Sequence, residues 1–534
     1  MICLNISSPH ERVSNMSLDT CPRVLLGGTL IDGTGAPPIK DSVVVIENEY
    51  IKSVGKRSDI PVPDGAEVYN LEGMTVLPGL IDSHCHFLNM GVSRMKNLQL
   101  GNTDSLDEAL SRVKDKVKNS KPGEWVIGRG WDESKWPENR YITKADLDPI
   151  SPDNPVMLVR VCGHMVSINS EALELAVITS ETEPPDGGSI DKDENGEPVG
   201  VLRDCRRLVT DVIPPTLEEE MVRGLESASA LALSLGCTGV HDAGLGPKEI
   251  RAYQDALQEG SLKVRAYLMI REEAPQGAVK LGLKTGFGDP MLRIGPIKLM
   301  MDGSLGARTA ALFEPYEDDP DTSGLLLMEP ERLKELVYNG PVNGIQTATP
   351  AIGDLAIEHA IDAIDDSLRR SPRKNHRHRI EHCEILSSQQ IERIAKLGIV
   401  PDMQPNFPGE WSGDDSMYRQ RLGETRDRMN NPYRAMLDEG IPVAFGSDGM
   451  PFDPIYGIWG AVDHPIRENA IDFVEAVKCY TYNAAYASFQ EDYVGSIEPG
   501  KLADPLRTGC PEPDYTDFQT NGKEIFNEIH QHNM

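Results

Sequence analysis

The segment "HRIEHCEILSSQQIERIAKLGIVPDMQP", residues 378–405, contains two short apolar runs separated by an amphipathic stretch. The apolar runs over 378–386 and 399–405 predict strands, and the stretch over 387–398 predicts a helix. A strand, a helix and a second strand in succession are typical of a parallel sheet, because the helix returns the chain to the sheet's starting edge.

The same unit recurs on both sides of this segment. Apolar runs over 293–303, 344–354 and 442–450 predict further strands, and the residues 355–370 predict another helix. Polar residues follow at the ends of these strands, a repetition that favours a (β/α)8 TIM barrel over an open sheet. No glycine-rich dinucleotide-binding fingerprint or phosphate-binding loop motif is found, so nucleotide-binding α/β folds lose support.

The part of the chain before residue 290 is organised differently. Short β-branched runs over 23–33, 42–55 and 66–79 predict a small β module. The segment "GLIDSHCHF", residues 79–87, follows directly and predicts the first barrel strand. Residues from about 88 to 240 have a mixed pattern, which indicates an insertion after that strand.

Composition limits the classes of function. The chain has 534 residues, 39% of them apolar and 26% charged, and a formal net charge of −31. This charge argues against binding to nucleic acid or to anionic lipid. No apolar run approaches the ~18–20 residues that span a bilayer, and no signal peptide is expected. Nine cysteines without C-x-x-C spacing predict a reduced, cytoplasmic protein.

Two histidines, His84 and His86, stand two residues apart at the end of the first predicted barrel strand. This spacing places both side chains on one face of a strand. At the carboxyl end of a barrel strand they can bind one cation, and zinc with an open coordination position activates water. Taken alone, such a pair is more often two structural or surface histidines.

Three further residues lie where such a site would need partners. Asp448 in "FGSDG" and His382 in "RIEHCE" stand at the ends of predicted strands. Lys298 in "GPIKLMMDGS" is flanked by apolar residues, which predict its burial. Its side chain has two interpretations of equal weight: an internal salt bridge, with Asp302 as one candidate partner, or carbamylation by CO2 to give a carboxylate that bridges two metals.

Several of these stretches resemble a known family. The segments "LPGLIDSHCHF", "KLMMDGSLGARTAAL", "RIEHCE", "FGSDG" and "GSIEPGKLAD" are similar to the amidohydrolase superfamily. They resemble most closely its branch of large metal-dependent hydrolases that includes enzymes like N-substituted formamide deformylase (amidohydrolase family 3). The resemblance covers residues 23–504.

The resemblance implies a (β/α)8 barrel with a β-sandwich built from both ends of the chain, and one or two divalent metals, with zinc expected. By position, His84 and His86 would bind the more buried metal and His382 the second, with carbamylated Lys298 as the bridge. Asp448 would bind the first metal and act as general base, passing a proton from water to the leaving amine.

One position departs from the family pattern. The segment "QTATPAIGD", residues 346–354, places Pro350 where the family has a ligand histidine. Proline offers no metal-binding side chain. His359, His376 and His378 are poorly placed to replace it. The resemblance then implies a mononuclear site, a weak second metal or lost hydrolysis.

The expected domain bounds follow from these patterns. Residues 1–22 are expected to be a frayed or disordered N-terminus, 23–78 the N-terminal part of the sandwich, and 79–490 the barrel, with its insertion over about 88–240. Residues 491–504 return to the sandwich. From Pro505 a polar tail, residues 505–534, stands where the family has an apolar strand, and an incomplete sandwich with an irregular tail is predicted.

Three residues are candidates for substrate contacts, each with a structural alternative. His164 is either a pocket residue or a hydrogen-bonded structural histidine. Arg308 either orients a substrate carbonyl or carboxylate or forms a salt bridge. Trp131 either forms a pocket wall or packs in a loop.

The sequence thus predicts a metal-dependent hydrolase of non-peptide carbon–nitrogen bonds in an amide-like or N-acyl small molecule. The alternative is a catalytically impaired barrel that acts as a binding or regulatory protein, an interpretation that Pro350 supports. A ring-opening hydrolase or deaminase would use the same ligands, since loop shape decides the substrate. A homodimer is compatible with the sequence, which does not decide the oligomeric state.

Overall fold

The computed structural model describes residues 2–3, 21–161, 163, 165–185, 188–272 and 275–508. Two compact units make up the chain. One contains Met1–Met90 together with Ala228–Met534, and the other is the insertion, Gly91–Ser227.

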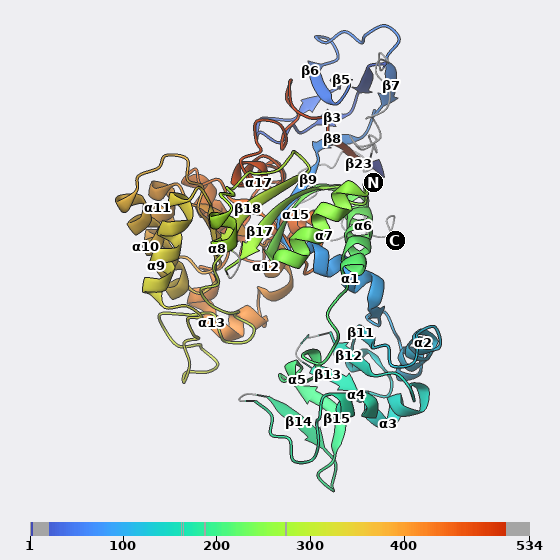
Figure 1. Cartoon of the computed structure of the whole chain (residues 1–534). Helices are drawn as coiled ribbons and strands as arrows, with labels where there is room; N and C mark the ends of the chain where they lie inside the picture. Colours follow the sequence, from blue (N-terminus) through green and yellow to red (C-terminus); the bar gives the residue numbers. More distant parts are fainter. Residues whose placement is uncertain are drawn as a thin grey trace. The chain divides into compact units, whose positions relative to one another are not determined.

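Eight parallel strands form the central sheet of the first unit (Figure 1). Their order is β22-β21-β20-β19-β18-β17-β16-β9. The hydroxyl of Ser83 in β9 donates to the carbonyl oxygen of Phe445 in β22 (2.7 Å), which brings the first and last strands together. The predicted (β/α)8 barrel is therefore confirmed. The strands are β9 (Leu80–Cys85), β16 (Cys237–Leu245), β17 (Arg265–Arg271), β18 (Leu292–Lys298), β19 (Thr347–Ala351), β20 (Arg379–His382), β21 (Val400–Met403) and β22 (Ala444–Phe445).

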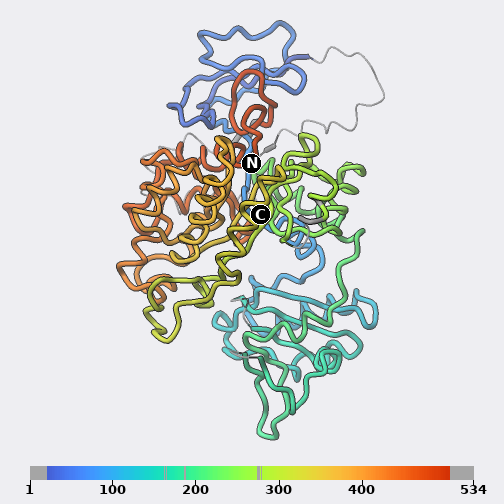
Figure 2. Tube along the Cα trace, turned by 60° about the vertical axis from the view of Figure 1, so that its left-hand side comes forward, coloured from blue at the N-terminus to red at the C-terminus, as the bar shows by residue number. Residues whose placement is uncertain are grey.

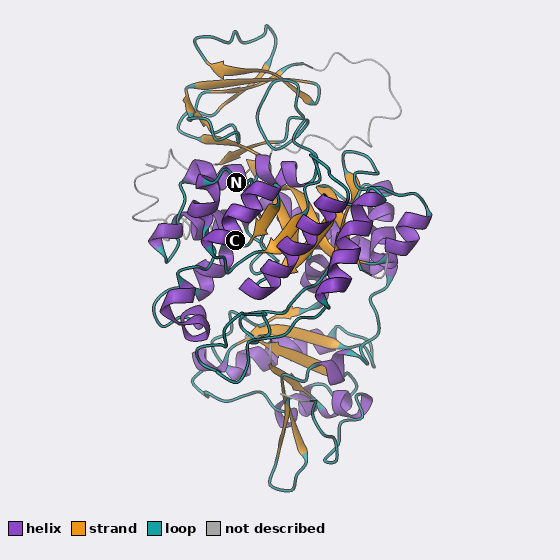
Figure 3. Cartoon of the chain, turned by 90° about the vertical axis from the view of Figure 1, so that its left-hand side faces the viewer, coloured by secondary structure: helices purple, strands orange, loops and turns teal. Residues whose placement is uncertain are grey.

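Helices surround this sheet (Figure 3). In α10 the residues Ile357, Ile361 and Ile364 are fully buried, and their spacing of three and four gives one apolar face against the barrel core. The helices of this unit are α1 (Phe87–Lys96), α6 (Glu218–Ser234), α7 (Pro247–Gln258), α8 (Pro275–Lys280), α9 (Pro330–Val342), α10 (Asp354–Arg370), α11 (Ser388–Leu397), α12 (Asn406–Trp411), α13 (Met417–Asp427), α14 (Tyr433–Asp438), α15 (Pro454–Val462), α16 (Phe473–Cys479) and α17 (Tyr482–Ala487), of which α1 and α6 extend into the insertion. Within the described parts of the chain, no helix has both the length and the apolar composition needed to cross a membrane.

A β-sandwich accompanies the barrel in the same unit. Its five-stranded sheet has the order β1-β23-β8-β3-β4 and its four-stranded sheet the order β6-β5-β2-β7. Leu25 and Val44 share its core with Ile497 and Ala503, so both ends of the chain build it (Figure 2). The strands are β1 (Ile2–Cys3), β2 (Arg23–Leu26), β3 (Thr29–Leu30), β4 (Ile39–Lys40), β5 (Ser42–Glu47), β6 (Tyr50–Lys56), β7 (Glu67–Asn70), β8 (Thr75–Pro78) and β23 (Pro505–Thr508).

The prediction of an irregular chain from Pro505 onward is wrong for its first four residues. These residues form β23, which pairs antiparallel with both β8 and β1. Proline is tolerated here because it is the first residue of the strand, where a missing N–H interrupts the ladder least. Residues 509–534, like residue 1 and residues 4–20, lie outside the described residues.

The insertion has a sheet of its own, with the strand order β10-β11-β12-β13-β15-β14. The unit Gly91–Ser227 is shorter than the expected 88–240, because α6 continues into the barrel unit and β16 is a barrel strand. The strands are β10 (Leu98–Gln99), β11 (Val126–Trp131), β12 (Val156–Arg160), β13 (Met165–Ile168), β14 (Ser189–Lys192) and β15 (Pro198–Arg203), and the helices α2 (Leu106–Lys118), α3 (Lys144–Leu147), α4 (Ser170–Leu175) and α5 (Arg207–Thr210).

Candidate metal centre

The two histidines of the first barrel strand lie at its carboxyl end. His84 is the fifth residue of β9 and His86 follows the strand's last residue. His84 is fully buried, whereas 41% of the His86 side chain is exposed. The pair therefore reaches from the barrel interior to its surface.

Asp448 follows β22, the last strand of the barrel sheet, and its side chain lies next to both histidines. Its Oδ1 lies 3.2 Å from Nε2 of His86 and 3.9 Å from Nε2 of His84. One ligand atom from each of the three residues lies within 4.8 Å of the other two. Burial raises the pKa of Asp448, but the His86 hydrogen bond and the neighbouring imidazoles outweigh it and hold this pKa below its ordinary value. Asp448 therefore offers an ionised carboxylate oxygen, a candidate metal ligand, at neutral pH.

The backbone after β22 aims Asp448 at the site. Asp448 has a left-handed conformation (φ 53°), and its N–H donates to the carbonyl oxygen of His84 (2.7 Å). A Cβ on Gly446 would lie 2.3 Å from the backbone nitrogen of His84, so only glycine permits this approach. Left-handed non-glycine residues cost about 1–3 kcal/mol, and the surrounding contacts hold this one in place.

His84 is held by a carboxylate from β20, a strand that does not pair with β9. Its Nδ1 lies 2.5 Å from Oε2 of Glu381, and both side chains are fully buried. Burial, the largest cause, lowers the pKa of His84 to about 3, so its imidazole is neutral. Because Glu381 accepts the Nδ1 proton, Nε2 keeps its lone pair and faces Asp448 as a metal ligand.

His86 is positioned through the helix that begins after it. The carboxylate of Asp242, on β16, accepts the backbone N–H groups of Phe87 and Leu88, each at 3.0 Å. Asp242 in turn accepts the hydroxyl of Tyr253 (2.6 Å). These bonds fix the first turn of α1 and with it the backbone that carries His86.

His382 closes the site from the end of β20. Its ring centroid lies 4.9 Å from that of His84, and its backbone is left-handed (φ 69°). Nδ1 lies 2.6 Å from the side-chain oxygen of Gln404, which accepts its proton and leaves Nε2 as the ligand atom. Burial lowers the pKa of His382, which favours the neutral form that binds metals.

Lys298 is the last residue of β18 and is buried beside His84. Its Nζ lies 3.3 Å from Nε2 of His84. Burial lowers its pKa, which favours the neutral amine. Asp302 is engaged elsewhere, because its carboxylate accepts three backbone N–H groups of the loops after β18 and β19 at 2.9–3.0 Å. The interpretation of Lys298 as the salt-bridge partner of Asp302 is therefore wrong.

Pro350 faces the barrel interior without offering a ligand. Ala348, on the same face of β19, packs against Ala243 and Met269 inside the barrel. Pro350 pairs in register with Glu381, next to the strand end that carries His382. The position is therefore the one from which a histidine would reach the centre.

The other histidines that the sequence offers do not replace it. His378 precedes β20, at the opposite end from His382, and its Nδ1 lies 2.7 Å from the hydroxyl of Thr347. His376 is bonded to the carbonyl oxygen of Leu397 (2.8 Å), and His359 lies on α10.

Two of the three candidate substrate-contact residues, Arg308 and Trp131, have the contacts of their structural alternatives. Arg308 forms a two-point ion pair with Asp318 (3.1 and 2.9 Å), which is its structural alternative. Trp131 is fully buried in the core of the insertion, and its indole N–H donates to the carbonyl oxygen of Leu158 (3.1 Å), so it packs as a core residue. His164 lies outside the described residues.

The donor set fits a divalent cation. Imidazole nitrogens and a carboxylate oxygen are ligands that zinc accepts readily. His84 and His382 each have the far ring nitrogen bonded to an acceptor, the arrangement that prepares a histidine for a metal. The residues present therefore suit a metal at His84, His86 and Asp448, with His382 and Lys298 beside it.

Sequence reasoning missed the residues that hold these ligands. Gln404 and Asp242 stand in no motif of their own. Glu381 lies in the segment "RIEHCE", directly before His382, and a carboxylate inside an apolar strand was a signal that it faces the barrel interior. Gln404 and Asp242 become recognisable only when the strands are placed side by side.

Comparison with known proteins agrees with this geometry. The profile described as "Amidohydrolase family" matches residues 67–505. The protein YtcJ of Bacillus subtilis, whose name places it among amidohydrolases, is 34% identical over 87% of this chain and 90% of its own length. N-substituted formamide deformylase of Arthrobacter pascens is 28% identical over 87% of this chain and 89% of its own.

A solved structure is similar over nearly the whole fold. An uncharacterised metal-dependent hydrolase from Pyrococcus furiosus superposes with a TM-score of 0.75 at 30% identity, covering 91% of this chain and 98% of its own. The family match, the barrel and the candidate metal-binding residues at the strand ends lead to one assignment. The chain belongs to the amidohydrolase family of hydrolases.

Proposed function

We propose that the protein hydrolyses a carbon–nitrogen bond, other than a peptide bond, in an amide-like or N-acyl small molecule. The observation that carries the proposal is the convergence of His84, His86 and Asp448 at the carboxyl end of the barrel strands. The similarity to a protein named N-substituted formamide deformylase supports the bond type.

His84, His86 and Asp448 would hold a divalent cation, with zinc the expected ion. When bound, such a cation lowers the pKa of a coordinated water to near 7 and polarises a carbonyl group. Lys298, as a buried amine with a lowered pKa, is suited to react with CO2, and the resulting carbamate would add a carboxylate beside His382.

Asp448 would carry the proton. Its carboxylate accepts a proton from the attacking water, whose oxygen adds to the acyl carbon. The C–N bond then breaks as Asp448 delivers this proton to the departing nitrogen. The products are a carboxylic acid and an amine, and Asp448 returns to its ionised form.

A second candidate function is a barrel that binds a small molecule without turnover. Pro350 favours it, because it removes a ligand from the face of β19 that points into the barrel. In this alternative the cation at His84, His86 and Asp448 has a structural or ligand-binding role.

Metal analysis with an activity panel separates the two. The purified protein is analysed for metal per chain and assayed on N-formyl and N-acyl amines, cyclic ureides and aminated heterocycles. Hydrolysis of an N-acyl amine that is lost in Asp448→Asn supports the proposal. Bound metal without turnover supports the second candidate, and turnover of the cyclic or aminated compounds alone would indicate a ring-opening or deaminating enzyme.

A further inference from the structure

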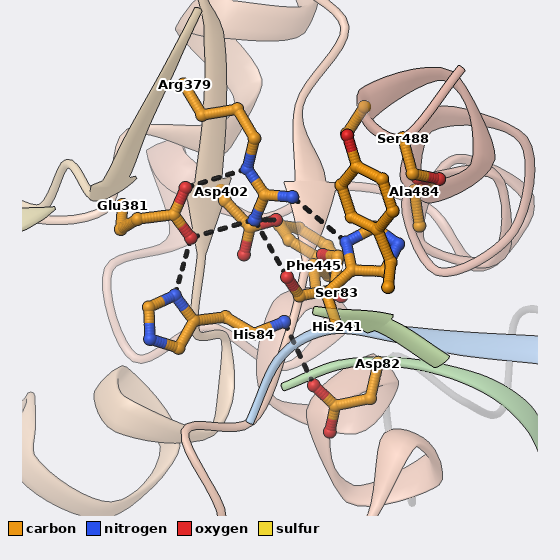
Figure 4. Close-up of polar contacts among 12 residues, drawn as sticks. Asp82, Ser83, His84, His241, Arg379, Glu381, Asp402, Phe445, Ala484 and Ser488 are labelled. Atoms are coloured by element: carbon orange, nitrogen blue, oxygen red, sulfur yellow. Dashed lines mark hydrogen bonds and ion pairs between the residues drawn. The ribbon is translucent and has the colours of Figure 1, made fainter. Parts of the chain in front are cut away.

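A buried arginine lies inside the barrel next to the metal centre (Figure 4). Arg379, the first residue of β20, is fully buried. Its Nε and Nη2 donate to the two carboxylate oxygens of Glu381 at 2.7 and 2.8 Å. This is the two-point geometry in which arginine fixes both the position and the rotation of a carboxylate.

The same guanidinium joins three more strands. Nη2 donates to the carbonyl oxygen of Ser83 on β9 and to the carboxylate of Asp402 on β21, each at 2.8 Å. Nη1 donates to Nδ1 of His241 on β16 (2.9 Å). Since arginine can only donate, Nδ1 of His241 must be the unprotonated nitrogen. The guanidinium therefore ties β20 to β9, β16 and β21.

This arrangement explains why His84, Glu381 and Asp402, whose ligand atoms also lie within 4.8 Å of one another, are not a second metal site. Arg379 already supplies the positive charge that both carboxylates face. Arg379 is linked to the metal centre through two successive contacts. The guanidinium fixes Glu381, and Oε2 of Glu381 then takes the Nδ1 proton of His84 at 2.5 Å.

We propose that Arg379 is a positioning residue for the metal centre, which sets the orientation and tautomer of His84 through Glu381. The inference rests on the proposed metal-binding role of His84. Its test uses metal affinity without substrate, so that a protein that binds metal but does not hydrolyse still tests it.

Arg379→Lys keeps the positive charge but loses the fork that grips Glu381. Loss of an outer hydrogen-bond partner of a metal ligand costs about 10–100-fold in affinity, and this loss is expected for zinc in competition titrations. The absorption spectrum of the cobalt(II)-loaded protein should change as well. Unchanged zinc affinity and an unchanged cobalt spectrum in a folded Arg379→Lys protein would overturn the proposal.

Arg377→Lys is the matched control. Arg377 stands two residues earlier, is also buried, and grips both carboxylate oxygens of Glu491 at 2.8 and 2.5 Å. The same substitution there removes an equivalent fork without a link to His84. It should lower the melting temperature but leave the zinc affinity within about twofold; an equal affinity loss in both variants would show a merely structural role.

A double-mutant cycle with Glu381→Gln tests whether Arg379 acts on His84 through Glu381. If Arg379 acts through Glu381, Arg379→Lys should cause no further loss of affinity in the Glu381→Gln background. Fully additive losses would contradict the route. In metal-free protein, the downfield proton resonance of the His84 Nδ1–H group should disappear in both single variants, and its persistence in Arg379→Lys would also count against the proposal.

If Arg379→Lys fails to fold, the double variant Arg379→Gln/Asp402→Asn replaces it. This pair removes the guanidinium and one carboxylate together, so the formal charge of the buried cluster stays the same. Its zinc affinity should fall as stated for Arg379→Lys, and wild-type affinity in the folded double variant would overturn the proposal.

Discussion

Which ring nitrogen His84 or His382 offers to a metal depends on the residue that binds its other ring nitrogen. His84 presents Nε2 because Glu381 takes its other ring proton, and His382 does so because of Gln404. His86 is different, because the hydrogen bonds of Asp242 fix the backbone next to His86, at the start of α1, and do not involve the His86 ring. Its ring is also the most exposed of the three, so its loss should affect binding more than folding.

His86→Ala tests this expectation. Replacing a part-exposed side chain should change the free energy of unfolding by less than about 0.5 kcal/mol. Zinc affinity should fall by more than the about 100-fold that loss of an outer partner can cost, because a ligand is removed. Zinc competition and thermal melts measure the two quantities. His359→Ala, on α10, is the control, and equal zinc affinity in the two variants would remove His86 from the site.

Pro350→His tests the missing ligand. Because position 350 shares the interior face of Ala348, the new imidazole should reach the space beside His382. Metal content should rise by about one ion per chain, measured by elemental analysis after dialysis. Pro350→Ala should leave the content unchanged. An unchanged content in Pro350→His would mean that the second position is closed for a reason other than proline.

At the residue scale, the sequence predicts the candidate ligands, which stand at the ends of barrel strands. It misses the residues that orient these ligands by hydrogen bonds. His84, His86, His382 and Asp448 follow apolar strands, a position visible in one dimension. Glu381 and Gln404 act across strands, so their roles depend on which strands are neighbours. For Arg308 and Trp131 the sequence leaves a substrate contact and a structural role open, because their partners, Asp318 and the insertion core, are identified only in the folded chain.

At the scale of elements, hydrophobic period predicts the barrel strands and helices well. The segment 378–405 folds as β20, α11 and β21, as its pattern indicates. The strand β23 was missed because residues 505–508 carry no apolar alternation. They become a strand by pairing their backbone with β8 and β1, which local sequence does not show.

A helix cap in the insertion gives a prediction on pH. Asp146 closes a capping box with Thr143 at the start of α3 and pairs with both Nη groups of Arg140 (2.8 and 2.7 Å). Burial raises its pKa, but these hydrogen bonds outweigh it and lower the pKa below its ordinary value. The stabilisation is therefore complete above the unfolded pKa and is lost as the pH falls through the folded one.

Asp146→Asn should thus destabilise the protein by about 0.5–2 kcal/mol at pH 7, the usual cost of a cap. The difference in melting temperature from wild type should shrink as the pH is lowered from 5 toward 3. Calorimetric melts across this range measure it, with Glu174→Gln, an exposed residue of α4, as a control for general loss of an insertion carboxylate. A difference that stays constant with pH would contradict the assigned role of the Asp146 charge.

At the scale of the whole molecule, a bound cation should stabilise the fold by mass action. Free zinc at 100 times its dissociation constant adds about 2.7 kcal/mol if only the folded chain binds it. Dialysis against a chelator should lower the melting temperature, and added zinc should restore it in a concentration-dependent way. In His86→Ala the shift should be much smaller at the same zinc concentration. Equal shifts in both proteins would place the stabilising ion elsewhere.

The pairing of β8 with β23 has a consequence for how the chain is made. Val76 and Leu77 of β8 pair with residues 507 and 506, which leave the ribosome more than 400 residues later. The β8 edge of the sandwich therefore stays open until residues 505–508 have been made, which is after all eight barrel strands. A chain that stops before β23 would retain an unpaired β8 edge open to association with other chains.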